Sequence, residues 1–194
     1  MPPPLVFPAI ILKSYETGDT SEVFHVVSGE LGRFSVLGKG LRKSKQGLRA
    51  MLQPLSLVEL NVSYRDGADL GVLRDAALIE DHAALVNDLE RFTLGLLLAE
   101  AAGQCCHPGQ PAPEIFNALT GALRLCDPES HLPAPVAACA GLLDILSVAG
   151  YEPAIDPGLL RPWPDDKPRP RCFWLNVEQG FVHARRPQPR NAPD

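Results

Sequence analysis

With 194 residues, of which 45% are hydrophobic and 21% charged, the chain can bury a core in one domain or two small ones, which excludes an intrinsically disordered protein. Its apolar N-terminus lacks a basic leader, and no apolar run reaches the length of about 18 residues, so we expect neither a signal peptide nor a membrane span. The net charge is −5, and the five cysteines form no C-x-x-C pair, which suits free thiols in a reducing cytoplasm.

Residues 5–79 are predicted to form five β-strands with hairpin-like connections. The alternating pattern of SEVFHVVS, the turn at Ser28-Gly29-Glu30 and the hairpin signal Asp66-Gly67 divide the strands. Pro8 in the first strand indicates an edge or a kink. This number of short strands fits a small barrel of the oligonucleotide-binding (OB) type, closed or partly closed.

A cationic segment without acidic residues interrupts these strands. Residues 31–58 contain no Asp or Glu but six cations: Arg33, Lys39, Arg42, Lys43, Lys45 and Arg49. Since the chain has a net charge of −5, the remaining residues carry −11. A positive region on a negative body is expected where a polyanion docks, and Lys and Arg there would neutralise phosphates. The alternative is a solvated loop without a ligand.

Two aromatic residues near this segment are candidates for stacking on bases. Phe34 and Tyr64 are predicted to lie on the barrel surface, where an exposed ring could hold a base. Packing in the barrel core is the alternative for each ring.

Three helices are expected after the barrel, which gives an α+β chain. They cover residues 81–104, 114–126 and 134–150. Asp81 can cap the start of the first helix and Gly103 can end it, and Gly150 closes the third. The predicted inward residues are Leu85, Leu89, Phe92, Leu96 and Ala99 in the first helix and Ile115, Leu119, Ala122, Leu123 and Cys126 in the second. Such Ala- and Leu-rich faces must pack on other helices or on a partner.

The last part of the chain is rich in proline. Residues 172–185 are predicted to form a short hairpin that turns at 178–180, and residues 185–194 are expected to be disordered. The predicted domains are an OB barrel at 1–80, a helical domain at 81–150 and a C-terminal segment at 151–194.

Known catalytic and metal motifs do not fit. The glycines do not match a phosphate-binding Walker loop, which has the pattern G-x-x-x-x-G-K-[ST]. Gly32 precedes Gly38 by six positions instead of five, and Lys39 is followed by Gly40 instead of Ser or Thr. Cys105-Cys106-His107 lacks a second cysteine pair, and with Cys126 and Cys139 on apolar helix faces we expect buried thiols. We therefore expect no enzyme, cofactor or metal site. A nuclease would need carboxylates near the cationic segment, and residues 31–58 contain none.

The order of these parts resembles the RecO family of bacterial recombination mediators. The stretches AIILKSYETGDTSEVFHVVSGELGRFSVLGKGLRKSK and LRAMLQPLSLVELNVSYR resemble the family's opening strands, its Gly-basic loop and its L-x-x-x-L-Q-P strand. The stretch GLLDILSVAGYEPAID resembles the segment after the last helix of the family's central domain. The resemblance covers residues 5–158, and its first 80 residues or so are the most specific.

The resemblance implies a function. Members of this family have an OB barrel and a helical domain, bind single- and double-stranded DNA, and anneal strands coated by single-strand-binding protein. They work with RecR to load RecA, with RecF involved indirectly, in the cytoplasm at the nucleoid. The residues that occupy the family's DNA-binding stretch are Gly38, Lys39, Gly40, Arg42, Lys43, Lys45 and Arg49. The alternative is a protein-interaction adaptor whose DNA binding is weak or lost.

The chain departs from the family at a zinc module that many members carry. Its cysteine pairs would fall near Gly158, Arg161, His183 and Arg186, and no cysteine occupies these positions. The resemblance therefore implies a metal-free remnant of that hairpin. The family also continues with further helices, so the chain is either a short form or a truncated one.

Overall fold

The computed structural model describes residues 4–41, 46–64, 70–151, 154–155, 173–176 and 181–184. The chain divides into two compact units, Met1–Ala149 and Gly150–Asp194, and each is described by itself. Within the described residues, no helix has the length and apolar character needed to cross a membrane.

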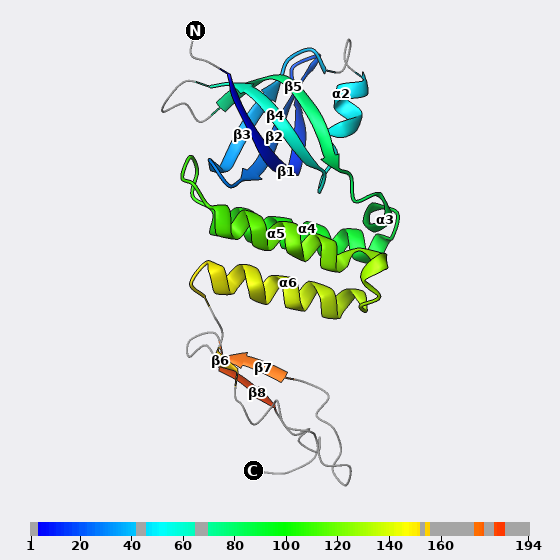
Figure 1. The fold of residues 1–194 in the computed structure, drawn as a ribbon, viewed down its shortest axis with the longest axis vertical. Helices are drawn as coiled ribbons and strands as arrows, with labels where there is room; N and C mark the ends of the chain where they lie inside the picture. The colour runs from blue at the N-terminus through cyan, green and yellow to red at the C-terminus, as the bar shows by residue number, and fades with distance from the viewer. Residues whose placement is uncertain are drawn as a thin grey trace, which may run out of the picture. The chain divides into compact units, whose positions relative to one another are not determined.

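The first unit opens with a closed five-stranded barrel (Figure 1). Its strands are β1 (Leu5–Thr17), β2 (Ser21–Ser28), β3 (Gly32–Gly38), β4 (Leu57–Ser63) and β5 (Leu70–Glu80). They close in the order β1-β2-β3-β5-β4, with β3 and β5 parallel and the other neighbours antiparallel. The predicted OB-type barrel is confirmed. The Asp66-Gly67 turn lies outside the described residues.

The pleat of β1 separates two hydrophobic cores. Ala9 and Ile11 point into the barrel, whereas Ile10 and Leu12 point outward and join the core formed with the helices. Pro8 lies where β1 pairs with β4 alone, since pairing with β2 begins at Ala9. This position agrees with the predicted edge, because proline cannot donate a hydrogen bond to a neighbouring strand.

A short helix between β3 and β4 is an element that the strand pattern does not predict. Helix α2 (Gln46–Met51) lies between two residues of the barrel core, Leu41 and Leu52, which are 1% and 2% exposed. Gly38 has no room for a side chain, because a Cβ there would collide with the side chain of Leu41. Leu41 after β3 and Leu52 after α2 are thus both fixed in the barrel core.

The expected first helix is interrupted. It consists of α3 (Ala83–Val86) and α4 (Leu89–Cys105), and the Asp88 side chain caps α4 by accepting a hydrogen bond from the Arg91 backbone N–H at 3.1 Å. Leu89, predicted to face inward, is 80% exposed, because the break places it at the start of a new helix. The prediction that Gly103 ends the helix is also wrong: Gly103 lies inside α4.

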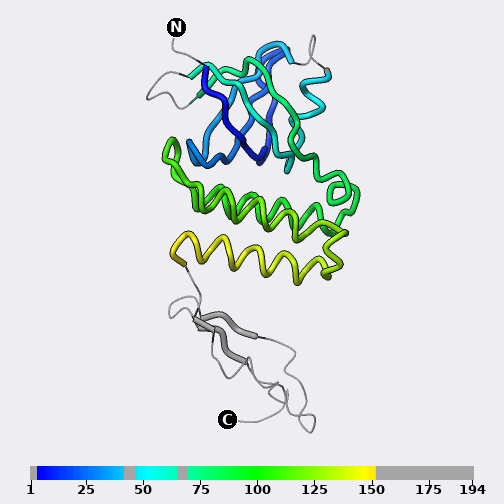
Figure 2. The backbone as a smooth tube through the Cα atoms, viewed as in Figure 1, coloured from blue at the N-terminus to red at the C-terminus, as the bar shows by residue number. Residues whose placement is uncertain are grey.

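The remaining helices are α5 (Pro113–Cys126), the 3-10 turn η1 (Pro128–Ser130) and α6 (Ala134–Val148). The inward face predicted for the second helix is confirmed, since Ile115, Leu119, Ala122, Leu123 and Cys126 are all buried. Helices α4 and α5 form a layer against the barrel, and α6 packs on the other side of that layer (Figure 2). Cys139 on α6 is exposed, which corrects the expectation of a buried thiol.

The second unit contains the predicted hairpin. Strands β7 (Phe173–Asn176) and β8 (Phe181–Ala184) pair antiparallel, and β6 (Ala154–Ile155) pairs with β8 in parallel. The turn at 178–180, Gly158, Arg161, Arg186, Cys172 and the tail at 185–194 lie outside the described residues.

Candidate nucleic-acid interface

One cation of the cationic segment lies at the turn after β3. Lys39 is exposed there, and Gly40 follows with a positive φ of 68°, which lets the chain reverse before Leu41 enters the core. Arg42, Lys43 and Lys45 lie outside the described residues. In the sequence these three cations stand between Leu41, which is buried in the barrel core, and helix α2.

Arg49 on α2 has a structural role that its sequence position does not reveal. Its Nε donates to Glu22 Oε2 at 3.0 Å, and its NH2 group lies 3.8 Å from Glu16 Oε1. Glu22 is only 5% exposed, and its other oxygen accepts a hydrogen bond from Ser14 Oγ at 2.7 Å. Arg49 therefore compensates a buried carboxylate and holds α2 against β1 and β2. This contact competes with its predicted contact to phosphate.

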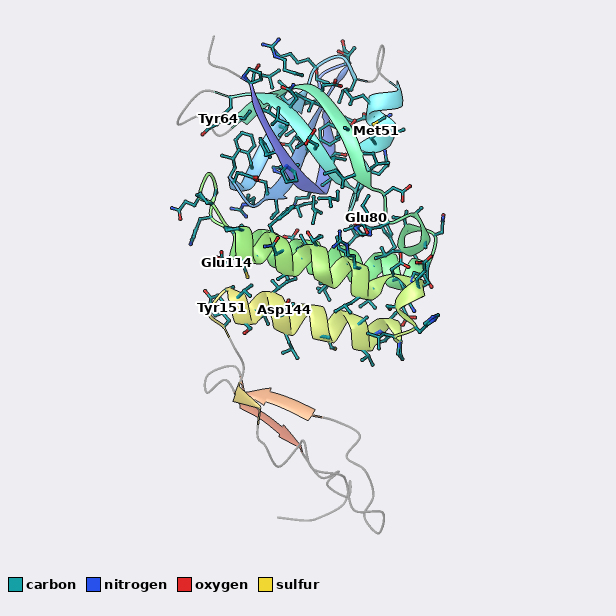
Figure 3. All side chains as sticks on the ribbon, viewed as in Figure 1. Met51, Tyr64, Glu80, Glu114, Asp144 and Tyr151 are labelled. Carbon is teal, nitrogen blue, oxygen red and sulfur yellow. The ribbon has the colours of Figure 1, made fainter. Side chains whose placement is uncertain are left out.

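Arg33 lies at the opposite end of β3 from Lys39. They are six positions apart, and at about 3.3 Å per residue the distance along the strand is about 20 Å. The six cations therefore do not form a single cluster. Figure 3 labels Tyr64 and Met51, the last residue of α2, at opposite sides of the barrel.

The two predicted aromatic residues differ in exposure. Phe34 is 4% exposed and belongs to the barrel core, so the expectation of a ring on the surface is wrong. Its ring makes edge-to-face contacts with Phe7 at 6.5 Å and Tyr64 at 5.2 Å between centroids. The alternation of GRFSVLG indicated this outcome, because Phe34 shares its side of β3 with Val36. Tyr64 is half-buried at the end of β4.

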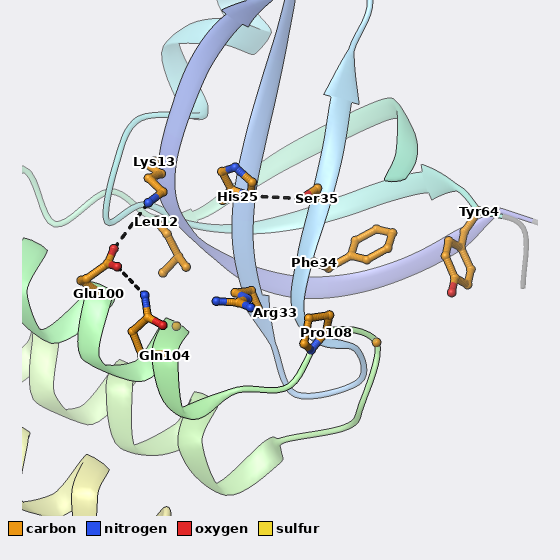
Figure 4. Close-up of a pocket in the computed structure, with 12 residues that line it drawn as sticks. Leu12, Lys13, His25, Arg33, Phe34, Ser35, Tyr64, Glu100, Gln104 and Pro108 are labelled. Carbon is orange, nitrogen blue, oxygen red and sulfur yellow. Dashed lines mark hydrogen bonds and ion pairs between the residues drawn. The ribbon is translucent and has the colours of Figure 1, made fainter. Parts of the chain in front are cut away.

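Arg33, Phe34 and Tyr64 nevertheless come together, because all three line one cavity of about 740 Å³ (Figure 4). The cavity lies between the outer face of β1–β3 on one side and α4 with the following loop on the other. The other lining residues are Leu12, Lys13, His25, Ser35, Glu100, Gly103, Gln104, Pro108 and Gly109. The cavity thus contains three of the eight residues predicted to bind DNA.

The strand register builds the floor of this cavity. Lys13 of β1 pairs with His25 of β2, which in turn pairs with Ser35 of β3. Residues paired in this way project from the same face of the sheet, and Arg33 shares that face because it precedes Ser35 by two positions. Ser35 Oγ lies 3.0 Å from His25 Nδ1.

The opposite wall comes from α4 and the loop after it. Lys13 Nζ lies 3.6 Å from Glu100 Oε2, and Gln104 Nε2 donates to Glu100 Oε1 at 2.8 Å. The Gly109 backbone N–H donates to the Arg33 carbonyl at 3.3 Å, which ties this loop to β3. Gly103 keeps α4 close to the barrel, since a Cβ there would lie 2.9 Å from Leu12 Cδ1.

The charged side chains that line the cavity are Lys13, Arg33 and Glu100, which sum to one positive charge. Burial lowers the pKa of His25, and the cations Lys13 and Arg33 lower it further, so the imidazole is neutral at pH 7. The hydrogen bond from Gln104 lowers the pKa of Glu100, and Lys13 and Arg33 act in the same direction. Within the described residues, the Arg33 guanidinium has no hydrogen-bond or ion-pair partner.

The cysteines of α4, α5 and the loop after α4 are not arranged as metal ligands. Burial raises the pKa of Cys106 to about 11, and burial raises the pKa of Cys105 and Cys126 as well, so these thiols stay protonated. Among the described residues, no group of three or more His, Cys, Asp or Glu side chains could hold a metal ion.

Sequence reasoning missed the residues that complete the cavity. Lys13, His25 and Ser35 lie on separate strands, and their cross-strand pairing could have been derived from a correct register. Glu100 and Gln104 come from a helix far along the chain, and no local pattern connects them to β3. Their placement depends on how α4 packs against the barrel.

Comparison with known proteins relates this architecture to one family. The family model described as recombination protein O N terminal matches residues 4–82, and the one described as recombination protein O C terminal matches residues 86–157. Together they account for more than half of the chain, and the first spans the whole barrel.

Individual relatives carry the name DNA repair protein RecO. The protein from Prosthecochloris aestuarii is 30% identical over 148 residues, which are 76% of this chain and 55% of the relative. The protein from Anaeromyxobacter dehalogenans is 29% identical over 147 residues, which are 76% of this chain and 57% of the relative. The protein from Syntrophobacter fumaroxidans is 31% identical over 125 residues, which are 64% of this chain and 49% of the relative. The chain spans about half the length of these curated relatives, and on the two family models it belongs to the recombination protein O family.

Proposed function

We propose that this chain is a DNA-binding mediator of recombinational repair that acts without catalysis. It binds single- and double-stranded DNA, promotes annealing of complementary strands, and supports recombinase loading together with RecR and single-strand-binding protein at the nucleoid. The observation that supports the proposal is an OB barrel whose β3 is followed in the sequence by four cations, Lys39, Arg42, Lys43 and Lys45, in a stretch without acidic residues.

The physical basis of annealing is charge compensation and proximity. Two DNA strands repel one another through their phosphates, and lysine or arginine side chains reduce this repulsion while holding the strands together. Lys39 is exposed, and Arg42, Lys43 and Lys45 follow it within six residues. Leu41 and Leu52 are buried in the barrel core, so we expect substitution of Lys39, Arg42, Lys43 and Lys45 to leave that core intact.

The decisive experiment measures DNA binding of the intact chain as a function of salt. If the four cations Lys39, Arg42, Lys43 and Lys45 each contact a phosphate, replacing all four by Gln reduces the slope of log K against log salt by about 3 for single strands. Replacing all four by Glu abolishes binding to single strands and to duplex.

Arg124→Gln is the matched control for a single Lys39→Gln variant. Arg124 is also exposed, and it pairs with Glu80 at 3.0 Å on the helical side of the molecule. Each variant loses one positive charge, but only Lys39→Gln is expected to weaken binding. If the four-Glu variant binds and anneals DNA with normal affinity, the assignment of the segment is wrong.

A protein-interaction adaptor is the second candidate, and the exposed side of α6 favours it. Val136, Leu143 and Val148 are 54%, 40% and 43% exposed on this helix. An adaptor would capture a protein partner such as single-strand-binding protein or RecR, and would bind DNA weakly. A pull-down of purified partners, compared with a DNA mobility-shift assay on the same preparation, separates the two functions.

A further inference from the structure

The cavity between the barrel and α4 has two chemically different ends. Figure 4 shows Lys13, Glu100 and Gln104 at one end, Tyr64 at the other, and Arg33 and His25 between them. A cavity of about 740 Å³ is within the range that holds a small ligand. The occupant should therefore carry an anionic group and a flat ring a short distance apart.

The charged part of the cavity favours an anion. Both oxygens of Glu100 are occupied, one by Gln104 at 2.8 Å and the other by Lys13 at 3.6 Å. Arg33 is half-buried and has no partner within the described residues. A guanidinium that is partly removed from water without a counter-ion is costly, and a phosphate would satisfy its fork of donors.

The aromatic part of the cavity favours a ring. Tyr64 is half-buried, and it meets Phe34 edge-to-face, with an angle of 81° between the ring planes. In this arrangement the edge of one ring points at the face of the other, and a further ring can stack beside the pair. Ser35 and His25, which line the cavity between its two ends, add hydrogen-bonding groups that can meet the edge of a base.

We propose that this cavity takes one unstacked nucleotide of single-stranded DNA, with a backbone phosphate held by Arg33 and Lys13 and the base placed against Tyr64. This inference rests on the proposed function, because it assumes that the chain binds DNA. It adds a difference between the two regions of the barrel. Lys39, Arg42, Lys43 and Lys45 contact phosphates of any strand, whereas the cavity accepts only a base that has left a duplex.

The test compares binding of oligothymidine and of a duplex of the same length. Arg33→Gln and Tyr64→Leu are expected to weaken oligothymidine binding by about tenfold, which corresponds to the loss of one stacked or charged contact, while duplex binding changes less than about twofold. Lys39→Gln should weaken both, and Arg124→Gln should weaken neither. Thermal unfolding of each variant checks that the barrel is intact.

A second measurement uses the unsubstituted protein and is independent of folding effects. Oligothymidine that carries 5-iododeoxyuridine is photo-crosslinked, and the modified residue is identified by mass spectrometry. The crosslink is expected at Tyr64. Tyr151, which is 69% exposed, serves as an internal control for unspecific labelling.

The outcomes separate the cavity from the proposed function. If Arg33→Gln and Tyr64→Leu weaken binding of single strand and duplex equally, or if the crosslink falls on Tyr151, the cavity inference is overturned while Lys39, Arg42, Lys43 and Lys45 retain their proposed role. If the unsubstituted chain binds neither DNA, the proposed function fails, and the cavity inference fails with it.

Discussion

Replacement of Arg49 by Met is the change that best separates a structural role from a DNA-binding role. The Arg49 Nε donates to Glu22 at 3.0 Å, and Glu22 is 5% exposed. Removal of the Arg49 guanidinium therefore leaves the buried Glu22 carboxylate with one hydrogen bond, from Ser14. A hydrogen bond to a buried charged group contributes roughly 1.5–3 kcal/mol. Because the Arg49 side chain is 44% exposed, water replaces part of this contact. We therefore expect Arg49→Met to lower the free energy of unfolding by about 2 kcal/mol.

Urea denaturation, followed by circular dichroism, measures this change. Glu22→Gln and the double variant complete a mutant cycle, in which the coupling between Arg49 and Glu22 is expected to be about 1–2 kcal/mol. DNA affinity of Arg49→Met, measured below its unfolding transition, is expected to fall by less than about threefold, the effect of one distant charge. If Arg49→Met leaves the free energy of unfolding unchanged but lowers DNA affinity more than about tenfold, the structural assignment is wrong.

Three further predictions concern Gly32 and Cys106. Gly32→Ala should lower the free energy of unfolding by roughly 2–4 kcal/mol in a urea titration, because Gly32 has a φ of 59° and a Cβ would meet the carbonyl oxygens of Gln110 and His107, the latter at 2.7 Å. Unchanged stability would show that the loop after α4 is not held by β3. Iodoacetamide at pH 8 should label the exposed Cys139 well before Cys106, which is 3% exposed with a pKa of about 11. Since the folded Cys106 thiol keeps its proton up to about pH 11 and an unfolded thiol loses it near pH 9, the contribution of Cys106 to stability should be lost between these values. Equal labelling of Cys106 and Cys139, followed by mass spectrometry, would contradict its burial.

The strands and helices could be predicted because their signals are local. Period-two alternation in β2 and β3 and the turn at Ser28-Gly29-Glu30 arise from neighbouring residues, and the inward face of α5 follows from its period of 3.6. The break before α4 was missed, because a leucine-rich pattern continues through it. Asp88 ends the earlier turn by offering its carboxylate to the first turn of α4.

The closing of the barrel depended on contacts between distant residues. The parallel pairing of β3 with β5 joins Ser35 to Leu70 and is not encoded in either strand alone. The register also decides which outward side chains become neighbours. Lys13, His25 and Ser35 form a row only when β1, β2 and β3 are aligned as observed.

The sequence by itself determined that positive charge is concentrated in residues 31–58, because charge is a property of composition and position along the chain. It also determined the barrel and the helices through their hydrophobic periods. Only the tertiary structure decided which cations remain available, because it pairs Arg49 with the buried Glu22 and places Arg33 about 20 Å from Lys39, in a cavity that α4 completes. The physical reason is that ion pairs and cavities depend on distances in space, which folding sets between residues that are far apart in the chain.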